Sequence, residues 1–258
     1  MREIVFFSTI NGVADGFPID YAKSLKFNWA ESARKDYKER IENDPGLRFN
    51  HVYRCPGIFD LLAHGFIMPM PWDVTIETNG DGEHFAWSFP SEDLQSLFQP
   101  PLLTGHFADK TAKYLPIKPG TLKTIIKLNT PWHVIVPDDI KFMMIPLPYP
   151  DSFDFENVPG ILDPSLSSEI NFQLRWNVLD GIRTIRAGTP MAQLIPLTNE
   201  KFKLTVRNGT PNDLEWVEKR KYLNNCTMTI KRPLVQNLYK RYFKSETILS
   251  KISRFLQR

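Results

Sequence analysis

The stretch EINFQLRW, at Glu169–Trp176, alternates polar and apolar side chains without a break. Successive side chains of a β-strand point to opposite faces of the sheet, so a period of two marks a strand with one buried face. The alternation places Ile170, Phe172, Leu174 and Trp176 on that face. It therefore predicts a half-buried β-strand.

Short apolar runs on both sides of this stretch have the same character. Each is rich in β-branched or aromatic residues and is bounded by Pro, Asp or Gly, as is typical of strands in a β domain. The runs lie at 132–136, 141–145 and 191–195, and similar segments occupy 3–10, 122–128 and 202–207. The 21 prolines of the 258-residue chain also favour many short strands over long helices. We predict a mainly β fold, either a barrel or a sandwich of short strands.

The turn sequence Asn79-Gly80-Asp81-Gly82 separates two predicted strands at 73–78 and 83–89. Asn-Gly and Asp-Gly pairs readily adopt the positive φ angles that tight hairpins require. A phosphate-binding P-loop would need a following Lys and a helix, and this segment has neither. We therefore interpret it as the turn of a β-hairpin.

Helices are predicted mainly outside the β region. Residues 28–43 are charged and have a thin apolar face, which is typical of a surface helix, and Asn28 is expected to cap it. Residues 56–64 predict a short helix that Gly65 ends. Ser91 begins a predicted helical turn over 91–98, and residues 213–222 predict a further helix.

The C-terminal section combines an apolar stripe with a strong positive charge. Apolar residues recur every three or four positions over 234–256, which predicts an amphipathic helix. From Lys219 to Arg258 the chain has 11 Lys or Arg and one acidic residue, while the remaining 218 residues carry 21 basic and 28 acidic side chains. We expect an N-terminal strand and surface helix packed on the core (1–49), a β core domain (50–207) and a basic helical extension (208–258).

Cysteine usage and hydropathy indicate a reducing compartment. Cys55 and Cys226 are the only cysteines and lie far apart in the sequence, so no disulfide framework is expected. Cys55 is expected to be a small buried residue. The N-terminal apolar run is too short for an export signal, and no stretch approaches 18 uninterrupted apolar residues. We predict a cytoplasmic protein without a transmembrane span, located in the host cytoplasm if the chain is viral.

Two segments around the alternating strand resemble the dUTPase and dCTP deaminase superfamily: Gly160-Ile161-Leu162-Asp163-Pro164 before it and Gly188-Thr189-Pro190-Met191-Ala192-Gln193 after it. The resemblance implies a dUTPase-like β-clip, with a nucleotide facing Asp163 on a hairpin. We take this fold as the first expectation and a jelly roll as the second. Asp163, Gly188 and Gln193 are candidate ligand-binding residues, and Asp163 is also a candidate catalytic residue.

Several catalytic positions of that superfamily differ in this chain. Leu166 stands where a dUTPase has an aromatic residue against the sugar, and Gln173 stands nearest to the catalytic Glu of the deaminases. An amide cannot act as a general base. Residues 145–158 lack a phosphate-binding Arg-Ser segment. A second interpretation is therefore that 160–164 forms a turn and 188–196 a core strand.

Several short segments spread over roughly residues 50–200 resemble a family of uncharacterised proteins from marine phages and bacteria. The segments are RCPGIFD at 54–60, GFIMP and PWD within 65–73, GHF at 105–107, TPW at 130–132 and GTP at 188–190. The resemblance implies a phage or phage-related accessory protein. It implies no particular activity.

Motifs for metal binding and catalysis leave one further candidate. The five histidines form no H-x-H, H-x-D or H-E-x-x-H pattern, so neither a metal site nor a cofactor is predicted. His106, close to Asp109, is a candidate metal ligand or general base, with a hydrogen-bonded loop histidine as the alternative. The nucleophile motif G-x-S-x-G is missing.

The basic tail is the strongest indication of a partner. Its candidate partner-binding residues are Lys240, Arg241, Tyr242, Phe243 and Lys244. The helix over 234–256 is predicted to mediate self-association or to dock on a protein partner. Two alternatives remain open: binding of nucleic acid or an anionic membrane by the tail, and packing of the apolar stripe on the protein's own β body.

These observations lead to three hypotheses about function. The first is a non-enzymatic phage or phage-related accessory or assembly protein that acts through the β scaffold and the basic amphipathic helix. The second is a nucleotide or small-ligand binding protein of dUTPase-like fold, including a degenerate or divergent pyrophosphatase or deaminase. The third is a metal or acid–base enzyme that uses His106 or Asp163.

Overall fold

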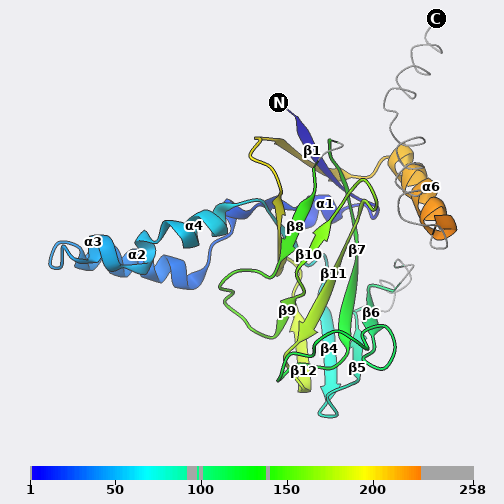
Figure 1. The fold of residues 1–258 in the computed structure, drawn as a ribbon, viewed down its shortest axis with the longest axis horizontal. Coiled ribbons are helices and arrows are strands. Elements are labelled where there is room, and N and C mark those ends of the chain that lie inside the picture. Colours follow the sequence, from blue (N-terminus) through cyan, green and yellow to red (C-terminus); the bar gives the residue numbers. More distant parts are fainter. Residues whose placement is uncertain (1, 92–97, 99–100, 138–139, 228–258) are drawn as a thin grey trace, which may run out of the picture.

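The computed structural model describes residues 2–91, 98, 101–137 and 140–227 (Figure 1). Over these residues the protein is mainly β, with fourteen strands in three sheets. The sheets lie against one another as in a sandwich, and each has open edges. The prediction of a mainly β sandwich is therefore confirmed, and the barrel alternative is wrong because no sheet closes on itself.

The first sheet has the strand order β14-β1-β7-β11-β9, and β6 also pairs with β7. Neighbouring strands are antiparallel except β1 and β14, which pair in parallel from opposite ends of the described chain. The strands are β1 (Glu3–Ser8), β6 (Leu103–His106), β7 (Ile125–Ile135), β9 (Phe155–Asn157), β11 (Glu169–Trp176) and β14 (Lys203–Asn208). A short helix, α1 (Val13–Gly16), follows β1.

The second sheet has the order β10-β8-β13-β3-β2 and the third has the order β12-β4-β5, all antiparallel. The predicted hairpin is confirmed by β4 and β5, in which Thr78 opposes Phe85. The strands of the second sheet are β2 (Asp20–Tyr21), β3 (Phe66–Pro69), β8 (Phe142–Ile145), β10 (Gly160–Leu162) and β13 (Pro190–Pro196). Those of the third are β4 (Val74–Asn79), β5 (Phe85–Ser88) and β12 (Asp180–Ile185).

The apolar face of β11 lies in the centre of the core. The strand has the predicted bounds, and the four apolar side chains of its alternating pattern have no exposed surface. They belong to one cluster with buried side chains from β1, β3, β4 and β8, namely Phe6, Met68, Ile76 and Phe142. The three sheets therefore share a single hydrophobic core.

The chain changes sheet between β10 and β11. β10 pairs with β8 in the second sheet, whereas β11 pairs with β7 and β9 in the first. Between them, the backbone N–H groups of Leu166 and Ser167 donate to the carbonyl of Asp163 at 2.9 and 3.0 Å. The segment around Asp163 is thus a turn that crosses between sheets, and not the hairpin that the resemblance to nucleotide enzymes implied.

A helical arm extends from the β body (Figure 1). It contains η1 (Ala22–Ser24), α2 (Asn28–Arg40), α3 (Leu47–Asn50), η2 (Val52–Arg54) and α4 (Pro56–Ala63). α2 has no buried residue, so the predicted surface helix is confirmed. The prediction that Cys55 is buried is wrong: it is exposed, because it is the N-cap residue of α4 in this arm, where interior positions are few.

Asn28 does not cap α2 as predicted. Phe27 occupies the N-cap position without a side-chain hydrogen bond, and the backbone N–H of Asn28 donates to Asp151 Oδ2 at 3.1 Å. The first N–H groups of a helix have no partner within the helix and attract negative charge. A carboxylate from a distant loop therefore replaces the local cap.

Helix α6 (Pro211–Thr227) packs on the outside of the first sheet through several polar and aromatic contacts. Arg207 at the end of β14 forms a two-pronged ion pair with Asp213, at 2.5 and 3.1 Å. Burial would raise the pKa of Asp213, but the Arg207 and Thr210 hydrogen bonds lower it to about 2. Farther along, the Arg220 guanidinium lies over the Trp216 ring and donates to the carbonyl of Pro164 at 2.6 Å. The predicted helix at 213–222 is confirmed.

His133 of β7 lies beneath this helix. Its ring stacks on Phe7 at 5.4 Å, Nδ1 is 3.1 Å from Ser168 Oγ, and the residue is 5% exposed. Burial and the positive charges of Lys221 and Arg220 lower the pKa of His133 to about 3. The folded protein therefore keeps this imidazole neutral at pH values where an unfolded chain protonates it.

We expect His133 to make the fold less stable in mild acid. Below about pH 6.5 the His133 imidazole becomes protonated in the unfolded state but stays neutral in the folded state. The free energy of unfolding therefore falls by up to about 1.4 kcal/mol per pH unit. His133→Gln should remove this part of the slope. Urea unfolding at pH 7, 6 and 5 measures it. His64→Gln, at an exposed histidine, is the control and should keep the slope; equal slopes in both variants would contradict the assignment.

Candidate functional site

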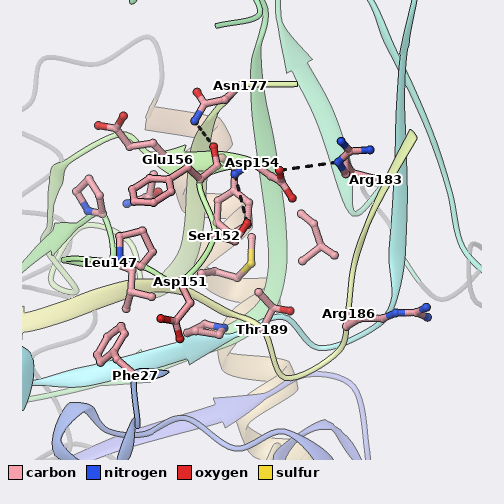
Figure 2. Close-up of a pocket in the computed structure, with 18 of the residues that line it drawn as sticks. Phe27, Leu147, Asp151, Ser152, Asp154, Glu156, Asn177, Arg183, Arg186 and Thr189 are labelled. Carbon is pink, nitrogen blue, oxygen red and sulfur yellow. Dashed lines mark hydrogen bonds and ion pairs between the residues drawn. The ribbon is translucent and has the colours of Figure 1, made fainter. Parts of the chain in front are cut away.

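A cavity of about 650 Å³ lies where the three sheets meet the base of the arm (Figure 2). Its walls come from β9 of the first sheet, the start of β13 of the second, the end of β12 of the third and residues 25–27 before α2. This volume is within the range of small-molecule sites in proteins. The cavity therefore joins parts of the chain that are far apart in the sequence.

A proline-rich loop between β8 and β9 covers one side of the cavity. Pro146, Pro148 and Pro150 end β8 and keep the loop from pairing as a strand, because proline has no N–H to donate. Tyr149 between them has a φ angle of +52°, which is rare and strained for an aromatic residue. The Tyr149 carbonyl accepts a hydrogen bond from Trp29 Nε1 at 2.9 Å. The loop is thus held in an unusual conformation against the arm.

Buried apolar side chains form much of the cavity wall, and one buried amide lies among them. Phe27, Ile185 and Met191 each have at most 5% exposure. Asn157 opposes Leu174 across the β9–β11 pair and is 1% exposed, so it shares the core-facing side of the sheet. Both Nδ2 and Oδ1 of Asn157 are buried without a hydrogen-bond partner in the protein. Buried amides normally have such partners.

The charged residues of the cavity wall are largely paired with each other or with their neighbours. Glu156 forms an ion pair with Lys118. Figure 2 shows Asp154 beside Arg183, at 3.9 Å. The third carboxylate, Asp151, accepts the N–H at the start of α2. The three acidic groups of the wall are therefore already compensated.

The turn from β12 to β13 forms one edge of the cavity. The N–H of Thr189 donates to the carbonyl of Arg186 at 3.0 Å, and Gly188 has a φ angle of +83°, which favours glycine. Asp73 fixes the turn: its carboxylate accepts the Ala187 N–H at 2.8 Å and the Arg186 guanidinium at 2.6 Å, and these bonds lower the pKa of Asp73. Gly188 thus shapes a turn whose neighbours Arg186 and Thr189 line the cavity.

Asp163 lies outside the cavity lining, in the crossing between β10 and β11. Its Oδ2 is 2.9 Å from Lys141 Nζ, and its Oδ1 accepts the backbone N–H and the hydroxyl of Ser165 at 3.1 and 2.5 Å. Burial would raise the pKa of Asp163, but Ser165 and Lys141 offset this effect and lower it. The carboxylate stabilises its own turn and an ion pair.

Gln193 of β13 connects the second sheet to the arm. Its Nε2 donates to the carbonyls of Leu61, in the last turn of α4, and of His64, the residue after the helix, at 2.7 and 2.5 Å. The Leu61 carbonyl also accepts the His64 N–H at 3.2 Å, whereas the His64 carbonyl lies beyond the end of the helix. His106 ends β6 in the first sheet, where burial and Lys127 lower its pKa. No interaction among the described residues links Asp163, Gln193 and His106, so the three do not form one site.

We predict that Gln193 contributes to stability by satisfying the end of α4. Gln193→Leu leaves the His64 carbonyl without its donor and the Leu61 carbonyl with one donor in place of two, and should lower the free energy of unfolding by about 2 kcal/mol. Chemical denaturation followed by circular dichroism measures the change. Gln173→Leu, at a half-buried glutamine of β11, is the control and should change it by less than about 0.5 kcal/mol. Equal effects at the two positions would contradict this role.

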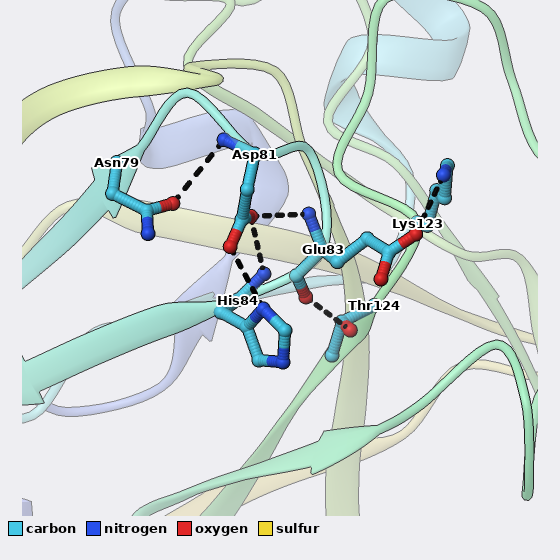
Figure 3. Close-up of polar contacts among 6 residues, drawn as sticks. All are labelled: Asn79, Asp81, Glu83, His84, Lys123 and Thr124. Carbon is cyan, nitrogen blue, oxygen red and sulfur yellow. Dashed lines mark hydrogen bonds and ion pairs between the residues drawn. The ribbon is translucent and has the colours of Figure 1, made fainter.

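A polar cluster closes the β4–β5 hairpin (Figure 3). The Asp81 carboxylate accepts the backbone N–H groups of His84 and Glu83 at 2.9 and 2.7 Å, and these bonds lower its pKa. The His84 ring and the carboxylate are also 2.8 Å apart. Glu83 pairs with Lys123 at 2.6 Å, and its carbonyl accepts the hydroxyl of Thr124 at 2.5 Å. These groups bond to one another, so the cluster shapes a turn, as the Asn-Gly-Asp-Gly sequence predicted.

The described part of the chain contains neither a metal-binding cluster nor a membrane-spanning helix. Among these residues, no group of three His, Cys, Asp or Glu side chains could hold a metal ion. None of their helices is long and apolar enough to span a bilayer. The predicted helix over 234–256, with Lys240, Arg241, Tyr242, Phe243 and Lys244, and most of the predicted turn at 91–98 lie outside the described residues.

Comparison of the chain with protein-family models, curated proteins and solved structures finds no match.

The cavity residues were missed because their sequence signal is weak. Residues 146–157 combine three prolines, three acidic residues and two phenylalanines, which is unusual for a connecting loop. The segment contains no known binding motif, and its composition alone does not indicate a cavity. Local sequence patterns do not reveal that this segment meets residues 25–27 and 183–191 in the folded chain.

Proposed function

We propose that this protein binds a small, uncharged ligand in the cavity between the three sheets and the arm. The observation that carries the proposal is the Asn157 amide, which lies in the wall of a cavity of about 650 Å³ with both polar atoms unpartnered. This proposal corresponds to the small-ligand hypothesis from the sequence, but at different residues. It does not require a reaction.

The state of Asn157 supports a bound group at this wall. Leaving a buried donor or acceptor unsatisfied costs about 1–3 kcal/mol. Both atoms are covered by protein in this conformation, so a ligand recovers that cost when the side chain turns toward the cavity, where a ligand acceptor meets Nδ2 and a ligand donor meets Oδ1. An amide, a nucleobase edge or a pair of hydroxyl groups has this arrangement.

The charges of the wall support a neutral ligand. Asp151, Asp154 and Glu156 each have a partner in the protein, and Arg186 pairs with Asp73 outside the cavity. The remaining charged residue of the wall, Lys26, is exposed. Near the buried apolar side chains, a ligand with a net charge would lie without a counter-charge or would have to break one of these pairs, which is costly. Phe27, Ile185 and Met191 offer it an apolar surface instead.

A fragment panel tests the cavity directly. We expect neutral amides and nucleosides to bind and simple carboxylates and amines not to bind, as measured by saturation-transfer NMR and thermal shift on the full chain. At a ligand concentration of 100 times Kd, binding should stabilise the fold by about 2.7 kcal/mol.

A bulky substitution provides the matched control. Thr189→Phe places a ring at the cavity edge and should abolish binding, whereas Thr198→Phe makes the same change outside the cavity and should leave it intact. Binding that survives Thr189→Phe, or a panel in which no neutral compound binds, would refute the proposal.

A second proposal concerns the segment that follows α6. We infer that residues 234–256 mediate self-association or docking on a protein partner, as in the accessory or assembly role suggested by the resemblance to phage and bacterial proteins. The supporting observation is the anchoring of α6 by the Arg207–Asp213 pair and by the Arg220 contact with Pro164. These contacts hold α6, which precedes the segment in the sequence, on the β body.

Light-scattering mass tests this second proposal. The full chain should form an oligomer, and a chain ending at Thr227, which keeps the α6 contacts, should be a folded monomer. Absorbance at 260 and 280 nm on the same sample distinguishes nucleic-acid binding by the basic tail. The same number of copies per particle for the two chains would contradict self-association through this segment.

A further inference from the structure

The loop between β6 and β7 exposes a group of large apolar side chains. Tyr114 is 90% exposed, Leu115 is 52% exposed, Ile117 is 50% exposed and Phe107 is 40% exposed. Isolated exposed apolar residues are common on protein surfaces, but four within eleven consecutive positions indicate an interaction site. We call residues 107–118 the apolar–basic loop.

Backbone contacts hold the apolar–basic loop in this conformation. The N–H of Ala112 donates to the carbonyl of Phe107 at 3.0 Å, and the N–H of Leu115 donates to the carbonyl of Ala112 at 3.0 Å. Ala112 is 4% exposed, so the small residue faces inward while the larger apolar residues face solvent. Pro116 restricts the backbone between Leu115 and Ile117. The exposure of the large side chains is therefore a property of the fold.

The same loop is basic. It carries Lys110, Lys113 and Lys118 but a single acidic residue, Asp109. Lys113 Nζ lies 5.7 Å from the centre of the Tyr114 ring, so charge and apolar surface are adjacent. Lys118 pairs with Glu156 at the base of the loop, which leaves Lys110 and Lys113 nearest to the exposed apolar residues.

We propose that the apolar–basic loop docks on an anionic lipid bilayer. Apolar side chains that enter the interface and lysines that contact anionic headgroups together give reversible membrane binding. Tyrosine in particular is enriched at the membrane–water boundary. Tyr114, Leu115 and Ile117 would enter the interface, and Lys110 and Lys113 would lie at the headgroups.

The composition of the loop favours a bilayer over other partners. Protein–protein interfaces are depleted of lysine, whereas all the cations here are lysines. Single-stranded nucleic acid is held by aromatic stacking and cations, to which the exposed aliphatic side chains of Leu115 and Ile117 add little. An anionic bilayer uses all three kinds of side chain.

The apolar–basic loop can be mutated without changing the start of the basic tail, because the two lie far apart on the β body. Lys123, just after the loop, donates its backbone N–H to the carbonyl of Gly82 at the tip of the β4–β5 hairpin. This hairpin and α6 lie at opposite ends of the β body (Figure 1). Substitutions in the loop therefore leave the start of the tail unchanged.

Vesicle flotation of the full chain tests the proposal, using phosphatidylcholine vesicles with and without 30% phosphatidylserine. Wild-type protein should bind the anionic vesicles and lose binding in 0.5 M NaCl. Lys110→Gln with Lys113→Gln should weaken binding by about fivefold per lysine. Tyr114→Ser with Leu115→Ser and Ile117→Ser should weaken it at least tenfold.

Ile161→Ser with Ile182→Ser, at exposed apolar residues elsewhere, is the matched control and should bind like the wild type. Thermal unfolding of all variants checks that they fold. No binding of the wild type to anionic vesicles would overturn the proposal. So would loss of binding only on Lys240→Gln with Arg241→Gln, or preferential binding of a single-stranded oligonucleotide that the loop variants abolish.

Discussion

Burial of one face of β11 is the constraint on which the rest of the structure depends. Its four apolar side chains are fully enclosed, and burying each contributes about 1.5–3 kcal/mol before the entropy of ordering. Because β11 also pairs with β7 on one side and β9 on the other, its position sets those of both neighbours. The second and third sheets then cover the apolar face of β11.

The cavity follows from where this packing ends. β9 has three residues and lies at an edge of the first sheet, and the proline-rich loop before it cannot extend the sheet. The gap is closed by side chains from the arm and from the β12–β13 turn. Asn157 occupies a core-facing position at this edge, where an apolar residue would normally be expected. The strained Tyr149 and the unpartnered amide therefore mark the same region.

Residues that looked like a nucleotide site have separate structural roles. Asp163 stabilises a crossing between sheets, Gln193 satisfies the end of α4, and Gly188 permits a left-handed turn. Similar residue types serve these purposes in many proteins, since a carboxylate, an amide and a glycine suit turns as well as ligands. The proposed activities lie at other surfaces: the cavity, the apolar–basic loop and the segment after α6.

The sequence by itself determined the elements whose evidence is local: the alternation of β11, the Asn-Gly-Asp-Gly hairpin, the surface helix α2 and the mainly β class. These patterns depend on backbone preference and side-chain period, which neighbouring residues specify. Only the tertiary structure decided the parallel pairing of β1 with β14, the Asp151 contact that replaces the predicted Asn28 cap, and the cavity around Asn157. Each of these joins segments more than 100 residues apart, and which segments meet is set by packing of the whole core.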